Sequence, residues 1–342
     1  MSKKIAILGS GANGTAIGVD LIRAGLDVTL IDQWPAHVEA LRANGATINL
    51  PDETITQAVD ACHLCDVATF TEPFDVVLML FKAYDTPWAA RLIEPYLAED
   101  GLLVGVQNGM SYDAMVAAVG VKRAMACVIE VASELHEPGI IKRSSPRDGG
   151  SWFAIGSADP ATAGREREIA EIMGHAGVVE ISDDILAAKW MKLVSNAMTL
   201  ATTALVGLPI DEAVEVPGMR DLMLKAGGEA LAAGKLRGHR VVPIFGLKPE
   251  DMENTNQLLE LLHGKLMSFT RPNTLTTVLM DHQKDRMSET NDVNGAVVAT
   301  LTSAGQMAPA NAAIVEVTER IRRGEIEPSL DNMKLIRELV AI

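Results

Sequence analysis

Cysteine is scarce in this chain: it occurs three times in 342 residues. Such a sparse, odd-numbered set does not build a disulfide framework and suits a reducing compartment, so we expect a cytoplasmic protein. Cys62 and Cys65 form a CxxC motif. A zinc site would need a second pair, however, and a redox site would need its thiols at a helix N-terminus. We therefore interpret both as half-buried cysteines of a strand.

Basic residues are also in deficit. The chain has 30 Lys and Arg against 45 Asp and Glu, which gives a formal net charge of −15 at pH 7. A surface of this sign repels nucleic-acid phosphates and anionic lipid head groups. We expect neither nucleic acid nor membrane as a partner.

Long apolar runs are missing. The first one, residues 5–8, is too short for the apolar core of a signal peptide. The longest uncharged stretch, 193–210, approaches the length of a membrane span. It contains several polar residues and a proline: Ser195, Asn196, Thr199, Thr202, Thr203 and Pro209. We therefore interpret it as a buried helix whose apolar side chains could also support a homodimer.

The N-terminal half alternates short β-branched or leucine-rich runs with helix-like segments. The main runs are residues 4–8, 27–31, 76–80 and 102–106. Further strands are expected at 124–131, 140–142, 152–155 and 178–181, with a helix over 161–176. This alternation predicts an α/β fold with a parallel sheet. At 342 residues the chain is long enough for two domains.

After residue 182 helical patterns dominate. We expect helices over 183–206, 217–237, 249–267, 276–304, 309–323 and 329–340. Pro217 and Pro309 suit the first position of their helices, where the missing N–H is not needed. The sequence therefore predicts an α/β domain over 1–182 and an all-helical domain over 183–342.

A glycine-rich turn follows the first predicted strand. It reads Gly9-Ser10-Gly11-Ala12-Asn13-Gly14 and leads into a helical segment and a second strand. Gly9 would allow the tight turn, Gly11 the approach of a pyrophosphate, and Gly14 close packing of helix on strand. The phosphates would lie at the helix N-terminus, near Ala12 and Asn13. The order of these elements predicts a Rossmann-type dinucleotide-binding domain.

Asp32 ends the second predicted strand, 21 residues after Gly11. A carboxylate there can accept hydrogen bonds from the adenosine ribose hydroxyls, whereas a 2′-phosphate would meet a like charge. The following residues, 33–36, include no Lys or Arg to receive such a phosphate. This favours NAD and leaves NADP possible. The alternative is that Asp32 only caps the next turn.

Four further segments, together with the glycine turn, resemble the ketopantoate reductase (2-dehydropantoate 2-reductase) family. They are residues 80–86 with Lys82, residues 106–109 with Asn108, residues 189–196, and residues 281–292 with Glu289. They occur in order over nearly the whole chain. The resemblance implies a nicotinamide-dependent oxidoreductase acting on CH–OH groups, in a family linked to pantothenate biosynthesis.

By this resemblance Lys192 would be the catalytic lysine and Glu289 its carboxylate counterpart, in a cleft between the two domains. Hydride addition to a ketone leaves negative charge on oxygen, which an ammonium group can stabilise and then protonate. Two simpler alternatives remain. Lys192 could be a surface lysine, although we expect Lys189 to be the solvated one, and Glu289 could share an acidic solvent face with residues 281 and 285.

The resemblance also implies residues that bind substrate and cofactor. Asn196 lies one helical turn after Lys192 and could bind a substrate carboxylate or hydroxyl, or simply a neighbouring helix group. Asn108 would lie beside the nicotinamide and the substrate. Lys82 would lie near the cofactor, or be an ordinary surface lysine. Thr277 stands where the family commonly has a serine and would contact the substrate.

The sequence departs from the family pattern at several positions. Leu200 replaces a second asparagine, residues 208–210 replace an Asn-Gly pair, and the stretch 237–275 is longer than usual. Loss of one buried polar partner costs about 1 to 3 kcal/mol of binding. Our first hypothesis is an NAD(P)H-dependent reductase of a small 2-oxo acid. The alternatives are an NAD-dependent dehydrogenase of a different hydroxy substrate and a dinucleotide sensor without turnover.

Overall fold

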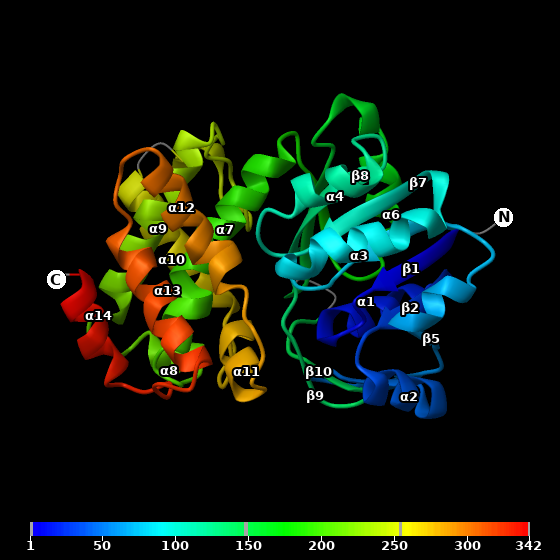
Figure 1. Cartoon of the computed structure of the whole chain (residues 1–342), viewed down its shortest axis with the longest axis horizontal. Coiled ribbons are helices and arrows are strands. Elements are labelled where there is room, and N and C mark those ends of the chain that lie inside the picture. The colour runs from blue at the N-terminus through cyan, green and yellow to red at the C-terminus, as the bar shows by residue number, and fades with distance from the viewer. Residues whose placement is uncertain (1–2, 147–149, 253–254, 341–342) are drawn as a thin grey trace. The chain divides into compact units, whose positions relative to one another are not determined.

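The protein folds into two compact units, Met1–Ile185 and Leu186–Ile342, in the computed structural model. The structure describes residues 3–146, 150–252 and 255–340. The first unit contains sheets covered by helices, and the described residues of the second contain helices and no strand (Figure 1). The expected fold class, an α/β domain followed by an all-helical region, is confirmed.

The main sheet of the first unit has eight strands in the order β12-β11-β8-β7-β6-β1-β2-β5. Their bounds are β1 (Lys4–Leu8), β2 (Asp27–Asp32), β5 (Asp60–His63), β6 (Phe74–Met79), β7 (Leu97–Val106), β8 (Ala124–Glu130), β11 (Trp152–Gly156) and β12 (Val178–Ile181). Neighbouring strands run parallel from β5 across to β8, as predicted. Beyond β8, β11 is antiparallel, a reversal that the strand patterns did not indicate.

A second sheet of four strands, in the order β4-β3-β10-β9, completes the first unit. It consists of β3 (Ala46–Asn49), β4 (Thr54–Gln57), β9 (Ser133–Glu137) and β10 (Ile140–Arg143). Only β10 was expected, because the other strands carry polar residues such as Asn49, Thr54 and Glu134, which obscure an apolar strand pattern. Helix α1 (Ala12–Arg23) packs against β1 and β2 and also against β3, β9 and β10. This double packing explains why every residue from 14 to 21 is buried.

The other helices of the first unit are α2 (Pro35–Asn44), α3 (Thr86–Ile93), α4 (Tyr112–Val119) and α6 (Glu166–Met173). The helix expected over 161–176 is shorter, because Pro160–Thr162 forms a separate 3₁₀ turn. Cys62 lies half-buried in β5, but Cys65 is exposed in a 3₁₀ helix, so the interpretation of both as strand residues was wrong for Cys65. No group of His, Cys, Asp and Glu in the described part of the chain could hold a metal ion.

The second unit is built from helices. They are α7 (Ile185–Ala204), α8 (Ile210–Ala213), α9 (Met219–Leu236), α10 (Thr255–Phe269), α11 (Thr277–Gln283), the π-helical η6 (Asn291–Gly295), α12 (Ala296–Ser303), α13 (Pro309–Arg322) and α14 (Asn332–Val340). A short 3₁₀ helix, η5 (Pro249–Met252), precedes α10, and residues 253–254 of the helix expected there lie outside the described residues. None of the described helices is long and apolar enough to cross a membrane.

Three expectations for the helical unit were wrong. The single helix expected over 276–304 is interrupted, because α11 ends at Gln283 and Asp285 adopts a positive φ of 51°. Pro217 precedes its helix, whose N-cap is Gly218, whereas Pro309 does occupy the first turn of α13. The apolar side chains of α7 are buried within the fold, so they do not offer the dimer surface that the sequence suggested.

Candidate active site

The predicted cofactor residues of the first unit meet at one edge of the main sheet. The glycine turn follows β1, Asp32 ends β2, Lys82 follows β6 and Asn108 follows β7. These four strands are parallel neighbours, so their carboxyl ends lie side by side. The chain order reverses between β1 and β6, and ligands of open α/β sheets bind outside the strand ends at such a switch point.

The backbone of the turn explains its three glycines. Gly9 has φ +98°, and a Cβ there would lie 2.5 Å from the Phe81 nitrogen. A Cβ on Gly14 would lie 2.3 Å from the Gly9 carbonyl oxygen, because α1 packs closely on the turn. A Cβ on Gly11 would meet nothing within 4 Å. Gly9 and Gly14 are therefore required by the fold itself, whereas Gly11 borders open space.

Backbone donors of the turn fit an anionic ligand, and two of its side-chain oxygens have no partner in the described residues. The Gly9 and Ser10 amides both donate to the Ile31 carbonyl, at 2.9 and 3.1 Å. Amides for a phosphate therefore begin at Gly11 and continue into the first turn of α1. Ser10 is fully buried, and neither its Oγ nor Oδ1 of Asn13 has a hydrogen-bond partner among the described residues. Such atoms mark a place where a ligand can supply the partner.

Asp32 does cap the following turn. Its Oδ1 accepts a hydrogen bond from the Trp34 amide at 2.8 Å, and the residue is 7% exposed. Capping and ribose binding are compatible, because a carboxylate offers about four lone-pair sites.

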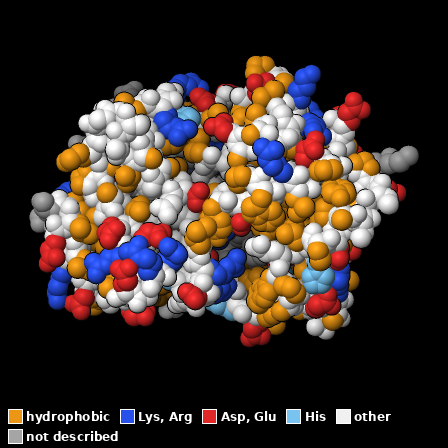
Figure 2. Space-filling view, viewed as in Figure 1, with side chains coloured by type: hydrophobic (Ala, Val, Ile, Leu, Met, Phe, Trp, Pro, Cys, Tyr) orange, Lys and Arg blue, Asp and Glu red, His pale blue; other side chains and the backbone are white. Residues whose placement is uncertain are grey.

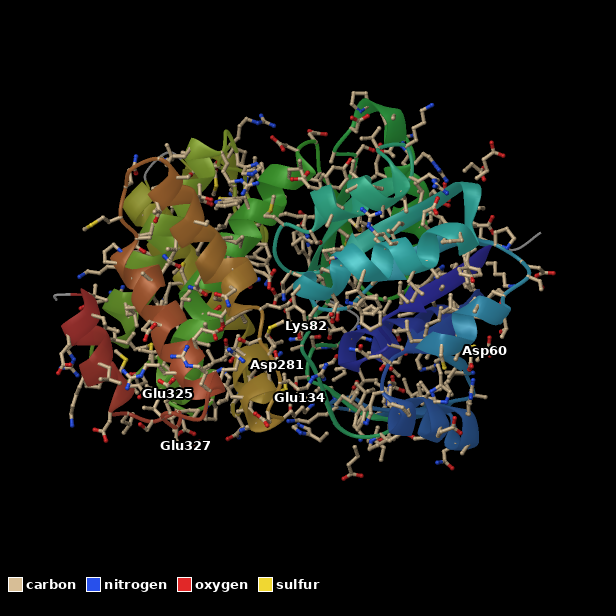
Figure 3. The ribbon with its side chains drawn as sticks, in the orientation of Figure 1. Asp60, Lys82, Glu134, Asp281, Glu325 and Glu327 are labelled. Carbon is tan, nitrogen blue, oxygen red and sulfur yellow. The ribbon has the colours of Figure 1, made fainter. Side chains whose placement is uncertain are left out.

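Gln107 connects the ends of two strands, a role that sequence reasoning missed. Its amide nitrogen donates to the Phe81 carbonyl at 2.6 Å, and its Oε1 accepts from Ser111 Oγ at 2.9 Å. It thereby joins the segment carrying Lys82 (labelled in Figure 3) to the loop carrying Asn108. Both of these residues are half-buried. The only sequence signal was the position of Gln107 directly before Asn108 in the matched segment.

In the second unit, α7 carries Lys192 and Asn196 one turn apart. Their exposed fractions are 8% and 2%, so Lys192 is not a surface lysine. Its Nζ lies 5.2 Å from the centre of the Phe245 ring, within the range of a cation–π contact. Lys189 was expected to be solvated, and this was wrong, since it is 3% exposed.

Trp190 fixes the rotation of α7. Its indole N–H donates to the Ala230 carbonyl of α9 at 2.9 Å, and a Cβ on Gly234 would lie 2.2 Å from the same nitrogen. Residues two apart on a helix point to different sides. Trp190 packed on α9 therefore directs Lys192 away from α9.

Glu289 is 6% exposed and lies just before η6. Asp281 on α11 (labelled in Figure 3) is also buried, whereas Asp285 is exposed. The helix ends between them at Gln283, so the three carboxylates do not form one acidic solvent face. Thr277 is half-buried at the start of α11, and it is Thr276 that caps this helix by accepting from the Leu279 amide.

A buried amide holds the segment after Glu289 to α7. The side-chain nitrogen of Asn294 donates to the Ala197 carbonyl at 3.2 Å and to Asn311 Oδ1 at 2.9 Å. Ala197 directly follows Asn196 on α7. The chain around Glu289 is thus attached to the same helix that carries Lys192, a connection that residue patterns did not predict.

Charges on the face shown in Figure 2 alternate in sign, with blue and red side chains interspersed at its lower left. The C-terminal helices account for several exposed ion pairs, including Arg322–Glu319 and Arg323–Glu325.

A glycine turn at the switch point of a parallel sheet is typical of an α/β unit that binds a dinucleotide, and in this chain a helical unit with a buried lysine and a buried carboxylate follows it. Comparison with known families agrees: residues 5–158 match "Ketopantoate reductase PanE/ApbA" and residues 184–322 match its C-terminal domain. The chain belongs to the ketopantoate reductase family, whose members act on CH–OH groups.

Relatives and solved structures match over most of the chain. A 2-dehydropantoate 2-reductase of Mesorhizobium japonicum is 27% identical over 78% of this chain and 88% of its own length. A 2-dehydropantoate 2-reductase of Archaeoglobus fulgidus is 23% identical over 86% of this chain and 90% of its own length. The crystal structure of a PanE/ApbA family ketopantoate reductase from Ralstonia eutropha has a TM-score of 0.78 at 27% identity, covering 94% of this chain and 99% of that one. A D-mandelate dehydrogenase structure shares the fold, with a TM-score of 0.81, 16% identity and coverage of 94% and 99%.

Proposed function

We propose that this enzyme reduces the carbonyl of a small 2-oxo acid, with Lys192 as the general acid. The observation that carries the proposal is the position of Lys192, which is 8% exposed on α7 with Asn196 one turn further on. Several relatives are named 2-dehydropantoate 2-reductase, which makes 2-dehydropantoate the first substrate to test.

The proposed chemistry assigns one task to each residue. NADH, when bound, would supply the hydride that the carbonyl carbon accepts. The Lys192 ammonium donates a hydrogen bond to the carbonyl oxygen and passes its proton to that oxygen as the charge develops. Asn196 and Thr277 bind the polar groups of the substrate. Glu289 accepts a hydrogen bond from the substrate or sets the position of Lys192.

The first unit holds the cofactor in this proposal. Amides from Gly11 to Gly14 receive the pyrophosphate at the start of α1, and Asp32 receives the ribose. Lys82 and Asn108 contact the nicotinamide half, and Asn108 also the substrate. We propose NAD as the preferred cofactor, because a 2′-phosphate beside the Asp32 carboxylate would be repelled.

An NAD-dependent dehydrogenase that oxidises a different hydroxy substrate is the second candidate. Asp32 and Leu200 favour it, because both depart from the family's usual cofactor and substrate pattern. A D-mandelate dehydrogenase shares the fold. A sensor without turnover is a weaker alternative, because Lys192 and Glu289 are both present and both buried.

A substrate panel separates these candidates. The purified enzyme is assayed by nicotinamide absorbance with NADH or NADPH and 2-oxo acids, and with NAD and the corresponding 2-hydroxy acids and secondary alcohols. The proposal predicts its highest kcat/KM for a 2-oxo acid with NADH. A hydroxy substrate that surpasses every oxo acid would favour the dehydrogenase, and binding without turnover on the whole panel would favour the sensor.

A homodimer remains part of the proposal. Because the apolar side chains of α7 are buried, the dimer interface would use other side chains. Light scattering coupled to gel filtration measures the mass directly. A mass near the 36.5 kDa of one chain would contradict the dimer.

A further inference from the structure

His37 is a fully buried histidine to which the proposed mechanism gives no task. It lies near the start of α2 and is 0% exposed. Burial lowers the pKa of His37, and this outweighs the opposing effect of the Asp32 carboxylate. A neutral imidazole has one N–H donor and one acceptor nitrogen. The contacts of the two nitrogens therefore decide what the ring does.

The two ring nitrogens contact different parts of the first unit. Nδ1 accepts a hydrogen bond from the Gly139 amide at 2.9 Å, so the ring proton is on Nε2. Nε2 lies 2.9 Å from the Ser10 carbonyl oxygen and 3.1 Å from Thr15 Oγ1. Thr15 Oγ1 itself donates to the Ser10 carbonyl at 2.5 Å. Two buried side chains thus hold one carbonyl of the glycine turn.

Holding this carbonyl also orients the next amide. The peptide between Ser10 and Gly11 is planar and trans, so its C=O and N–H point in opposite directions. Because the Ser10 oxygen points inward to His37 and Thr15, the Gly11 N–H points to the other side. A Cβ built on Gly11 meets nothing within 4 Å, so there is open space next to this peptide. Gly11 also supplies the first amide not already donated to Ile31.

The Gly139 contact connects the turn to the second sheet. Gly139 lies between β9 and β10, and its carbonyl accepts from the Thr47 amide at 2.9 Å. His37 therefore bridges the glycine turn of the main sheet to the loop that joins two strands of the second sheet. The second sheet thereby becomes a support for the turn.

We propose that His37 is a positioning residue for dinucleotide binding: it orients the Ser10–Gly11 peptide so that the Gly11 N–H faces the pyrophosphate. This rests on the proposed function, in which the turn binds NAD. The role concerns affinity for the cofactor and not the chemical step, because His37 acts through the Ser10 carbonyl of the glycine turn.

Two substitutions separate the two ends of the ring. His37→Gln places an amide nitrogen near the former Nε2 and keeps a donor for Ser10. His37→Asn places an oxygen near the former Nδ1 and keeps an acceptor for Gly139 only. The dissociation constant of NADH is measured by fluorescence titration on the full chain, together with kcat at saturating NADH and the Tm of each variant.

Loss of the His37 donor leaves Thr15 Oγ1 as the remaining side-chain donor to the Ser10 carbonyl. The peptide is then held less firmly, and NADH binding should weaken by about tenfold in His37→Asn. His37→Gln should bind NADH nearly as tightly as the wild type, although its Tm falls to a similar degree. Saturating kcat should be retained in both. Equal NADH affinity in the two variants, whether both are intact or both are weakened, overturns the proposal.

Thr15 provides a second test if His37→Asn does not fold. Thr15→Val removes the other donor to Ser10 at nearly constant volume, and Thr15→Ser keeps it. Weaker NADH binding in Thr15→Val than in Thr15→Ser supports control of affinity through this carbonyl, and identical affinities overturn it. Wild-type protein that binds neither NADH nor NADPH would contradict the proposed function itself, and this role with it.

Discussion

The two units both bury charged side chains, but the surroundings of those charges differ. In the first unit, Asp20 on α1 pairs with Arg143 on β10, and both are less than 5% exposed. Arg143 also donates to Ser151 Oγ at 2.8 Å and to the Ala176 carbonyl at 2.9 Å. These contacts join α1 to both sheets. In this unit the buried pair of Asp20 and Arg143 supports the fold, and neither residue belongs to the proposed cofactor site.

In the second unit two of the buried charges, Lys192 and Glu289, are the side chains to which we assign the chemistry. Lys192 is buried on α7 one turn before Asn196, and Glu289 is buried just before the π-helical segment. The neutral side-chain amide of Asn294 holds this segment to α7. The comparison teaches that burial alone does not identify a functional charge. Substitutions in the first unit should change stability or affinity, and those at Lys192 should change turnover.

The largest effect on stability is expected from Arg143→Met. Removing one member of a buried ion pair leaves Asp20 without compensation and costs about 3 to 5 kcal/mol of unfolding free energy. Arg323→Met is the control, because its pair with Glu325 is exposed and screened by solvent, so its loss should leave the unfolding free energy nearly unchanged. Denaturant unfolding measures both. Equal losses would show that the buried pair does not support the first unit.

A smaller effect is expected on cofactor affinity when the turn gains a methyl group. Gly11→Ala adds a Cβ in open space, so the Tm should stay at the wild-type value while NADH binds about tenfold more weakly. Gly14→Ala should lower both the Tm and the affinity for NADH, because its Cβ meets the Gly9 carbonyl. Titration and thermal unfolding test the pair. Unchanged NADH affinity in Gly11→Ala would place the pyrophosphate elsewhere.

The smallest effect concerns the choice between NADH and NADPH. Asp32→Asn keeps an oxygen for the Trp34 amide but removes the negative charge. Losing a like-charge repulsion worth about 1 kcal/mol should lower the preference for NADH by about fivefold. The ratio of the two dissociation constants measures this preference. A wild-type protein that already prefers NADPH would refute the argument from Asp32.

The sequence predicted those parts of the first unit that depend on local patterns. Apolar strands, the spacing of Gly9, Gly11 and Gly14 and the acidic end of β2 all lie within short stretches. The sheet order then brings these stretches together, as a parallel α/β fold requires. The antiparallel β11 and the roles of His37 and Gln107 depend on contacts between distant segments, such as His37 with Gly139, and no local pattern encodes them.

In the second unit, local patterns indicated that helices form but not where they break. The positive φ of Asp285 and the π-helical turn before α12 interrupt a continuous helical pattern, since tertiary contacts override propensity there. Lys192 and Glu289 were identified only through the family resemblance. Periodicity alone could not separate them from Lys189 or Asp285, because burial depends on which helix packs on each face.

Single-turnover kinetics of Lys192→Met test the central claim most directly. Enzyme saturated with NADH is mixed with the best 2-oxo acid from the panel, and the rate of NADH oxidation is recorded beside that of Lys225→Met, an exposed lysine on α9. Loss of the general acid should slow this step by about 10² to 10⁴-fold while the NADH dissociation constant stays at the wild-type value. A hydride-transfer rate equal to that of the wild type would contradict the assignment of Lys192 to the chemistry.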